Sequence, residues 1–207
     1  SVATGTFEPS ASTSRIYYIV DTNSNGNTNQ FQIYRGEPVG NNNQVTSTND
    51  NPFNVSGIAD IDGDSNNELV YYNQNNNIQY LDDGTSDINS VGYTNSPASG
   101  DSVGTPAVFD SITSSQALIP IINTAGEIEL VDNTGTVRET LTAARAPEPA
   151  SLGGFDIDDD TNTEIVYVED SSSNQVVALN VNDGTTDMLQ NQGGSDVTSG
   201  DATGGTK

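Results

Sequence analysis

The 207-residue sequence predicts an all-β fold, most simply a small β-propeller of about four blades. Three observations predict it. Runs of β-branched and aromatic residues recur four times along the chain, a second strand-like run follows each of them, and turn-forming Asn, Gly, Asp and Ser separate the runs. No segment shows the 3.6-residue apolar period of an amphipathic helix, so we expect almost no helix.

The repeats are defined by pairs of predicted strands. The first strand of each pair begins with Ile16, Leu69, Leu118 or Ile165, which gives a repeat length of about 50 residues. These first strands are expected at 16–20, 69–72, 118–122 and 165–168. The second strands are expected at 31–34, 78–81, 128–131 and 176–179. A weaker third strand is expected at 88–93, 137–141 and 187–190, and a preceding strand at 55–61, 105–110 and 152–157.

Four strands in a repeat of this length are typical of a propeller blade. The predicted blades span approximately 1–50, 51–100, 101–148 and 149–192. The predicted organisation is an extended amino-terminal segment at 1–14, a repeat β-domain at 15–190 and a flexible carboxy-terminal tail at 193–207. The alternative is a β-sandwich, which also uses many short strands with frequent turns but does not require equal repeats.

The composition excludes several functions. Five Lys and Arg face 29 Asp and Glu, so the net charge is -24, and Cys, His and Trp are absent. Disulfides and thiolate metal sites are therefore impossible, and binding to nucleic acid or to anionic membranes is disfavoured. No apolar run reaches the ~18 residues of a membrane span. The acidic surface indicates a halophilic protein, and the chain, which begins without Met, is expected to be a mature or cut form of a secreted protein.

Two nine-residue acidic loops carry the strongest chemical signal. Both 60–68 and 156–164 have carboxylates at their first, third, fifth and ninth positions and Asn at the seventh. Calcium requires six to eight oxygen ligands, so the matched loops predict about two Ca²⁺ sites. Asn66 and Asn162 would offer backbone carbonyls, whereas Glu68 and Glu164 would close the sites. The predicted metal ligands are Asp60, Asp62, Asp64, Asn66, Glu68, Asp156, Asp158, Asp160, Asn162 and Glu164.

These loops resemble the calcium loops of the FG-GAP and VCBS repeat family, which occurs in integrin-α-like propellers and in microbial surface proteins. The resemblance implies a secreted propeller with calcium loops on one rim and a role in recognition or adhesion. The loops also depart from each other, because Asp159 replaces Gly63 in the second copy. The third repeat keeps only Asp110 at this place, with Ala117 where the closing Glu is expected, and the first repeat has no such loop.

The residue content favours a non-catalytic protein. Without His or Cys, the commonest general base and the thiolate nucleophile are absent. Glu127 and Glu129 could form a glycosidase pair, but alternating Glu residues more simply mark the solvent face of a strand. We therefore expect recognition or adhesion at the cell surface, with a protein or glycan as partner. The alternatives are a self-assembling subunit of an extracellular filament or surface layer, whose partners are other copies, and a carbohydrate-active enzyme or lectin.

Overall fold

The computed structural model describes the strands and most of the connections between them. The described residues are 2–5, 7, 15–21, 31–36, 43–45, 52–73, 75, 77–82, 87–95, 97, 102–113, 115–142, 152–157, 162–169, 175–182 and 184–188. They contain fifteen strands and no α-helix. The all-β prediction is therefore confirmed. The described part of the chain also has no helix of the length and apolarity that a membrane crossing requires.

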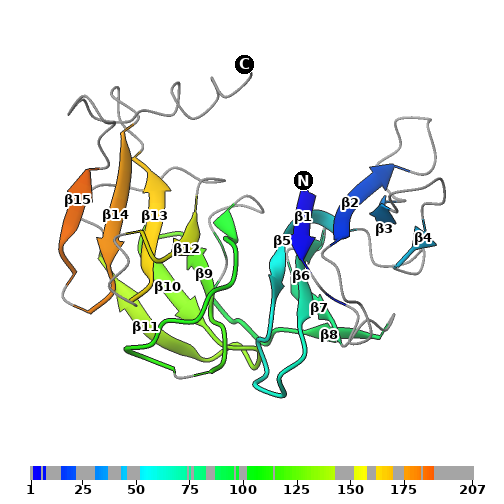
Figure 1. Ribbon diagram of the computed structural model, residues 1–207, viewed down its shortest axis with the longest axis horizontal. Coiled ribbons are helices and arrows are strands. Elements are labelled where there is room, and N and C mark those ends of the chain that lie inside the picture. Colours follow the sequence, from blue (N-terminus) through cyan, green and yellow to red (C-terminus); the bar gives the residue numbers. More distant parts are fainter. Residues whose placement is uncertain are drawn as a thin grey trace.

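The strands form four separate antiparallel sheets in chain order (Figure 1). Sheet 1 contains β1 (Val2–Gly5), β2 (Arg15–Asp21), β3 (Phe31–Gly36) and β4 (Asn43–Gln44). Sheet 2 contains β5 (Pro52–Ala59), β6 (Glu68–Asn73), β7 (Ile78–Leu81) and β8 (Ile88–Ser90). Sheet 3 contains β9 (Ile119–Ile122), β10 (Ile128–Val131) and β11 (Val137–Leu141). Sheet 4 contains β12 (Gly153–Phe155), β13 (Glu164–Val168), β14 (Val176–Asn180) and β15 (Thr186–Met188).

The predicted strands coincide closely with those observed, with one exception. The structure also has β4 and β1, and β1 belongs to sheet 1 although residues 1–14 were predicted as an extended segment outside the repeat β-domain. The segment predicted as a strand at 105–110 makes only isolated bridges, of which that of Ala107 with Leu118 joins it to the β9 side of sheet 3. Just before this segment, Val103 forms a similar bridge with Ile121 of β9. Beyond it, the backbone turns, because the carbonyl of Phe109 accepts hydrogen bonds from the N–H groups of Ile112 and Thr113. The third repeat is thus also a four-segment unit, but its innermost segment is irregular.

The central sheets are buried on both faces. In β6, Leu69 and Tyr71 pack toward sheet 1, whereas Val70 and Tyr72 pack toward sheet 3. Successive side chains of a strand point to opposite faces, so a strand that is apolar at every position requires a neighbour on each side. β9 behaves in the same way, since all four of its residues are buried. The continuous apolar runs of the sequence therefore mark sheets that are covered by other sheets.

Three apolar cores join the four sheets in series. One core lies between sheets 1 and 2, a second between sheets 2 and 3, and a third between sheets 3 and 4. Figure 1 shows the sheets following one another along an arc, with β1, β5 and β12 toward its middle. This arrangement of four sheets differs from the two facing sheets of the alternative sandwich.

Small residues let the inner segments of neighbouring sheets approach closely. A Cβ atom added to Gly104 would lie 2.7 Å from the carbonyl oxygen of Leu152, so this position has no room for a side chain. Next to it, the Thr105 hydroxyl donates a 3.1 Å hydrogen bond to the carbonyl of Ser56, and Thr105 forms a parallel bridge with Gly153. The inner segments of sheets 2, 3 and 4 are therefore in direct contact with one another. The described strands show no such pairing between sheet 1 and sheet 4.

Candidate metal centre

The acidic loop of the second repeat connects β5 to β6 and has an unusual backbone. Gly63 has φ +86° and Ser65 has φ +77°, both in the left-handed region. Glycine adopts this region without steric cost, which explains Gly63, whereas a serine there is uncommon. Each of these residues donates its backbone N–H to a carboxylate oxygen of Asp60, Gly63 at 2.7 Å and Ser65 at 2.9 Å. Asp60, the first aspartate of the loop, therefore stabilises this left-handed turn.

The other two aspartates cap the turn in the same manner. Asp62 accepts a hydrogen bond from the N–H of Asp64 at 3.1 Å, and Asp64 accepts one from the N–H of Asn66 at 2.8 Å. The Asn66 side-chain amide also donates to Asp64 at 3.2 Å. These bonds fold the loop so that alternate side chains return toward a common centre.

Five carboxylates gather in two overlapping groups. Asp60, Asp62 and Asp64 form one group, and Asp62 also forms a group with Glu68 and Asp82. Within each group, one oxygen from every residue lies within 4.8 Å of the others. Two oxygens that share one calcium ion at about 2.4 Å are separated by no more than this distance. Four of the five residues were predicted as ligands from the sequence.

Asp82 was missed by the sequence analysis. It directly follows β7, whose residue Leu81 pairs with Leu69 of the neighbouring strand β6. This pairing brings Asp82 to the end of the sheet at which the acidic loop enters β6. The sequence around Asp82 indicates only the start of an Asp-Asp-Gly turn after the predicted strand at 78–81. The pairing register, which the sequence alone does not give, is what assigns it to the site.

Glu68 carries a buried carboxylate oxygen that no protein group hydrogen-bonds. Its side chain is fully buried; one carboxylate oxygen accepts a 2.7 Å hydrogen bond from the N–H of Ile61, and the other has no hydrogen-bond partner. Burial, reinforced by the nearby charges of Asp62, Asp60 and Asp64, raises the pKa of Glu68 to about 8. Burial and the charges of Asp64, Asp82 and Asp60 also raise the pKa of Asp62. A buried anionic oxygen without a partner is costly, and a bound cation would remove that cost.

The donor set fits calcium. All five side chains offer carboxylate oxygens, the ligand type that hard divalent cations take. The loop and the end of β7 bring them together without His or Cys. Magnesium fits less well, because it usually retains several waters instead of accepting so many protein ligands. When bound, calcium would supply positive charge at the point where these carboxylates repel each other.

The loop also makes the contact between sheets 2 and 3. The N–H of Ala117 donates a 2.7 Å hydrogen bond to the carbonyl of Asp60, and the Gln116 amide donates a 2.5 Å hydrogen bond to the carbonyl of Ile61. The Ile61 side chain is fully buried in the core between these sheets. A cation that fixes the loop would therefore also fix the packing of one sheet on the next.

The matching loop of the fourth repeat is only partly described. Asp158 and Asp160 lie outside the described residues, as does Asp159. Glu164 is buried like Glu68, and it accepts a 3.1 Å hydrogen bond from the N–H of Ile157, the residue that matches Ile61. Asp156 is exposed, and Asn162 is half-buried. The entry of the loop into β13 thus repeats the geometry of the second repeat, and the second calcium site stays a prediction.

In the third repeat, an arginine pairs with Asp132, the residue at the position that corresponds to Asp82. Asp132 follows β10 as Asp82 follows β7, and Arg138 donates a 2.7 Å charged hydrogen bond to it. Asp132 also accepts hydrogen bonds from Thr134 and from the N–H of Thr136. Burial alone would raise the pKa of Asp132, but these donors together lower it. The repeat that lacks the acidic loop therefore balances this carboxylate with a side chain.

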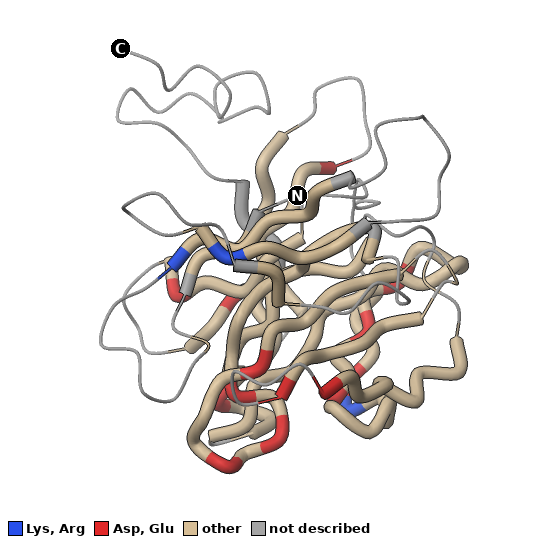
Figure 2. The backbone as a smooth tube through the Cα atoms, turned by 90° about the vertical axis from the view of Figure 1, so that its right-hand side faces the viewer, with Lys and Arg blue, Asp and Glu red and all other residues tan. Residues whose placement is uncertain are grey.

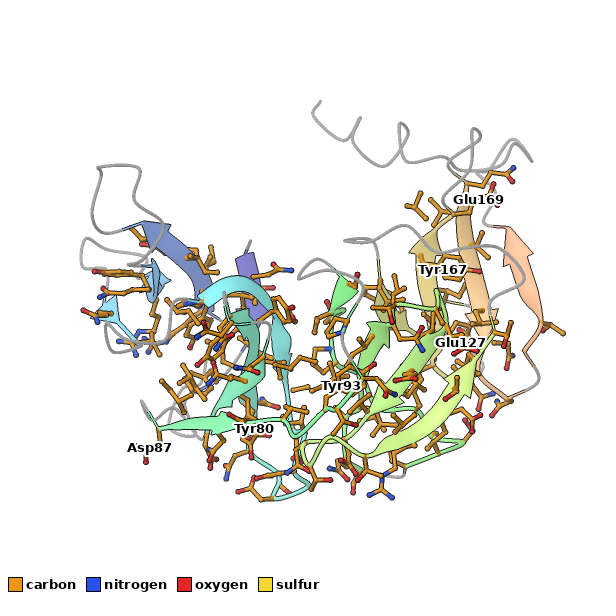
Figure 3. The ribbon with its side chains drawn as sticks, turned by 180° about the vertical axis from the view of Figure 1, so that it is seen from behind. Tyr80, Asp87, Tyr93, Glu127, Tyr167 and Glu169 are labelled. Carbon is orange, nitrogen blue, oxygen red and sulfur yellow. The ribbon has the colours of Figure 1, made fainter. Side chains whose placement is uncertain are left out.

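A second polar cluster surrounds Glu129 in sheet 3. Glu129 is 5% exposed, so it does not lie on a solvent face as the sequence analysis expected. It accepts hydrogen bonds from the Tyr93 hydroxyl at 2.6 Å, from Asn95 at 3.2 Å and from Asn123 at 2.9 Å. Asn123 also donates to Glu127, at 3.1 Å, and Figure 3 shows Tyr93 and Glu127 at this sheet. Glu129 thus ties the segment that follows β8 to the β9–β10 hairpin.

The Glu129 cluster predicts a pH-dependent contribution to stability. Burial alone would raise the pKa of Glu129, but the hydrogen bonds from Tyr93, Asn123 and Asn95 lower it below the ordinary value of 4.5. A lowered pKa in the folded state stabilises the protein above the unfolded pKa, and this stability is lost as the pH falls through the folded pKa. Glu129→Gln should therefore cost about 1–3 kcal/mol of unfolding free energy at neutral pH.

The pH dependence distinguishes this contribution from simple packing. The difference in unfolding free energy between the wild type and Glu129→Gln should shrink on acidification below about pH 5, as measured by urea unfolding. Glu139→Gln is the matched control, because Glu139 is exposed on β11. It should change the stability by less than about 0.5 kcal/mol at any of these pH values. A difference for Glu129→Gln that persists unchanged into acid would contradict the role of the charge.

The excess of acidic charge predicts that salt stabilises the protein. Figure 2 shows Asp and Glu concentrated on the loops at the lower end of the molecule. With a net charge of -24, self-repulsion opposes the compact state, and screening shortens its range to about 3 Å at 1 M salt. The melting temperature at fixed calcium should therefore rise from millimolar to molar potassium chloride. A steady fall of the melting temperature over the same salt range would contradict this prediction.

Comparisons with known proteins add no relative. No protein-family model matches the chain, and no curated protein is significantly similar to it.

Proposed function

We propose that the chain is a calcium-stabilised, non-catalytic repeat protein that acts outside the cell or at its surface. The buried Glu68 oxygen without a partner, placed among four aspartates, is the observation that supports calcium. The loop in which it lies joins two sheets, so the ion serves the structure instead of a reaction. The four sheets are proposed to be propeller-type blades that follow one another along an open arc, with their inner segments toward its middle.

The proposed role is recognition or adhesion, with a protein or glycan as partner. Glu127 and Glu129, the pair that a glycosidase would need, share the amide of Asn123, and Glu129 is buried under three side-chain donors. These contacts support a structural use of the pair. The halophilic and secreted character expected from the composition belongs to the same proposal, because extracellular fluids and brines supply calcium and screen acidic surfaces.

Calcium titration tests the proposal. Isothermal titration of the demetallated protein should show about two sites, by analogy between the two matched loops. Asp60→Ala should abolish the site of the second repeat and leave the other. Asp110→Ala is the matched control, since Asp110 occupies the corresponding place in the third repeat and is exposed. Absence of calcium binding to the wild type would overturn the proposal.

Two further measurements separate the candidate roles. Binding to arrays of glycans and surface proteins, in calcium and in chelator, tests recognition directly. Turnover of polysaccharides that is lost in Glu129→Gln would instead favour the carbohydrate-active enzyme. The self-assembling subunit is favoured by the apolar side chains that the first and last sheets leave exposed.

A further inference from the structure

The two sheets at the ends of the series leave apolar side chains exposed. Among the described residues, the exposed large hydrophobic side chains are Ile16 at 52%, Phe155 at 53% and Ile157 at 40%. Ile16 lies on β2 of sheet 1, whereas Phe155 and Ile157 lie in and just after β12 of sheet 4. The exposure is therefore confined to the first and the last sheet.

In the inner sheets, the corresponding positions are buried by a neighbouring sheet. Phe155 pairs with Glu164 as Ala59 pairs with Glu68, so Phe155 and Ile157 match Ala59 and Ile61. Ile61 is fully buried between sheets 2 and 3, and Ala59 packs against the same core. Phe155 and Ile157 are exposed because no further sheet follows sheet 4 in the described structure.

The same comparison applies to the other end of the series. Ile16 begins the apolar run of β2 as Leu69 begins that of β6, and Leu69 is fully buried against the preceding sheet. On the face of Ile16, the rings of Tyr18 and Tyr34 stack with their centroids 6.4 Å apart and are half-buried. Sheet 1 thus has a face for a preceding sheet, as sheet 4 has a face for a following one.

We propose that the outer face of sheet 4, marked by Phe155 and Ile157, packs on the outer face of sheet 1, marked by Ile16, of a second copy of this chain. Continuity with the internal interfaces carries the assignment, because each of the three internal cores joins a following face to a preceding face. The two faces differ, so the contact is head-to-tail and can repeat from copy to copy. The inference goes beyond the proposed recognition role by assigning a second copy of the chain as a partner, and it rests on the repeat architecture and not on calcium.

Cross-linking of introduced cysteines tests the contact, because the natural chain contains none. Ile16→Cys protein and Ile157→Cys protein would be mixed in molar salt with calcium and treated with a short bismaleimide. The mixture should give a cross-linked dimer, whereas each variant alone should stay monomeric. Thr124→Cys, at an exposed hairpin position of the third repeat, is the control and should give no link to either. Absence of the mixed dimer would overturn the proposal.

The double variant distinguishes assembly from closure within one chain. Ile16→Cys combined with Ile157→Cys should give a ladder of dimers and longer species. An intramolecular link that runs as a monomer would overturn the proposal in favour of a closed four-blade ring. In light scattering, Ile16→Asp and Phe155→Asp should each abolish the species larger than one chain. Ile16 lies outside both acidic loops, so Ile16→Asp should still bind calcium like the wild type, and failure of this inference is separable from failure of the calcium site.

Discussion

Removal of calcium should lower the melting temperature of the wild type by about 5–10 °C. A ligand that binds only the folded state stabilises it by mass action, by about 2.7 kcal/mol when its concentration is 100 times the Kd. In a domain of this size, 1 kcal/mol corresponds to roughly 2–4 °C. The measurement is thermal unfolding in millimolar calcium and in excess chelator, at the same ionic strength and pH.

Glu68→Gln tests at a single residue how calcium stabilises the protein. In calcium the variant should be less stable than the wild type, because it lacks a carboxylate ligand. In chelator the order should reverse or the difference vanish, because the substitution removes a buried charge whose pKa is raised to about 8 by burial and the neighbouring aspartates. Asp110→Ala is the control and should keep the full response to calcium. A variant that is less stable by the same amount in both conditions would show that Glu68 has only a packing role.

Leu118→Ala and Ile119→Ala should each destabilise the protein by about 2–5 kcal/mol. The two residues are adjacent and point to opposite faces, and both are fully buried. Leu118 belongs to the core shared with sheet 4, and Ile119 belongs to the core shared with sheet 2. In a sheet with one solvent face, only one of two adjacent substitutions would be costly.

Chemical denaturation at fixed calcium measures both effects. Thr140→Ala on β11 is the control, since its side chain is exposed, and it should change the unfolding free energy by no more than about 0.5 kcal/mol. A small effect of either Leu118→Ala or Ile119→Ala would contradict the packing of sheet 3 between its two neighbours.

Much of the candidate site could be predicted from the sequence because it is local. Asp60, Asp62, Asp64 and Glu68 lie within one nine-residue loop, and their spacing alone indicates that they converge. Asp82 joins them through the pairing of β6 with β7, a contact that a spacing pattern does not contain. Glu129 was predicted at a solvent face because it alternates with Glu127, but Tyr93 and Asn95 from another repeat bury it.

The sequence by itself determined most of the strands, the four repeats and the acidic loops, because apolar period, turn residues and ligand spacing are properties of neighbouring residues. Only the tertiary structure decided which sheets face each other, that the inner sheets are covered on both sides, and that Ile16, Phe155 and Ile157 stay exposed. The physical reason is that an apolar side chain gains free energy from any cover that excludes water. The sequence shows that an apolar side chain gains stability when another surface covers it. Only the folded structure shows whether the chain provides such a surface.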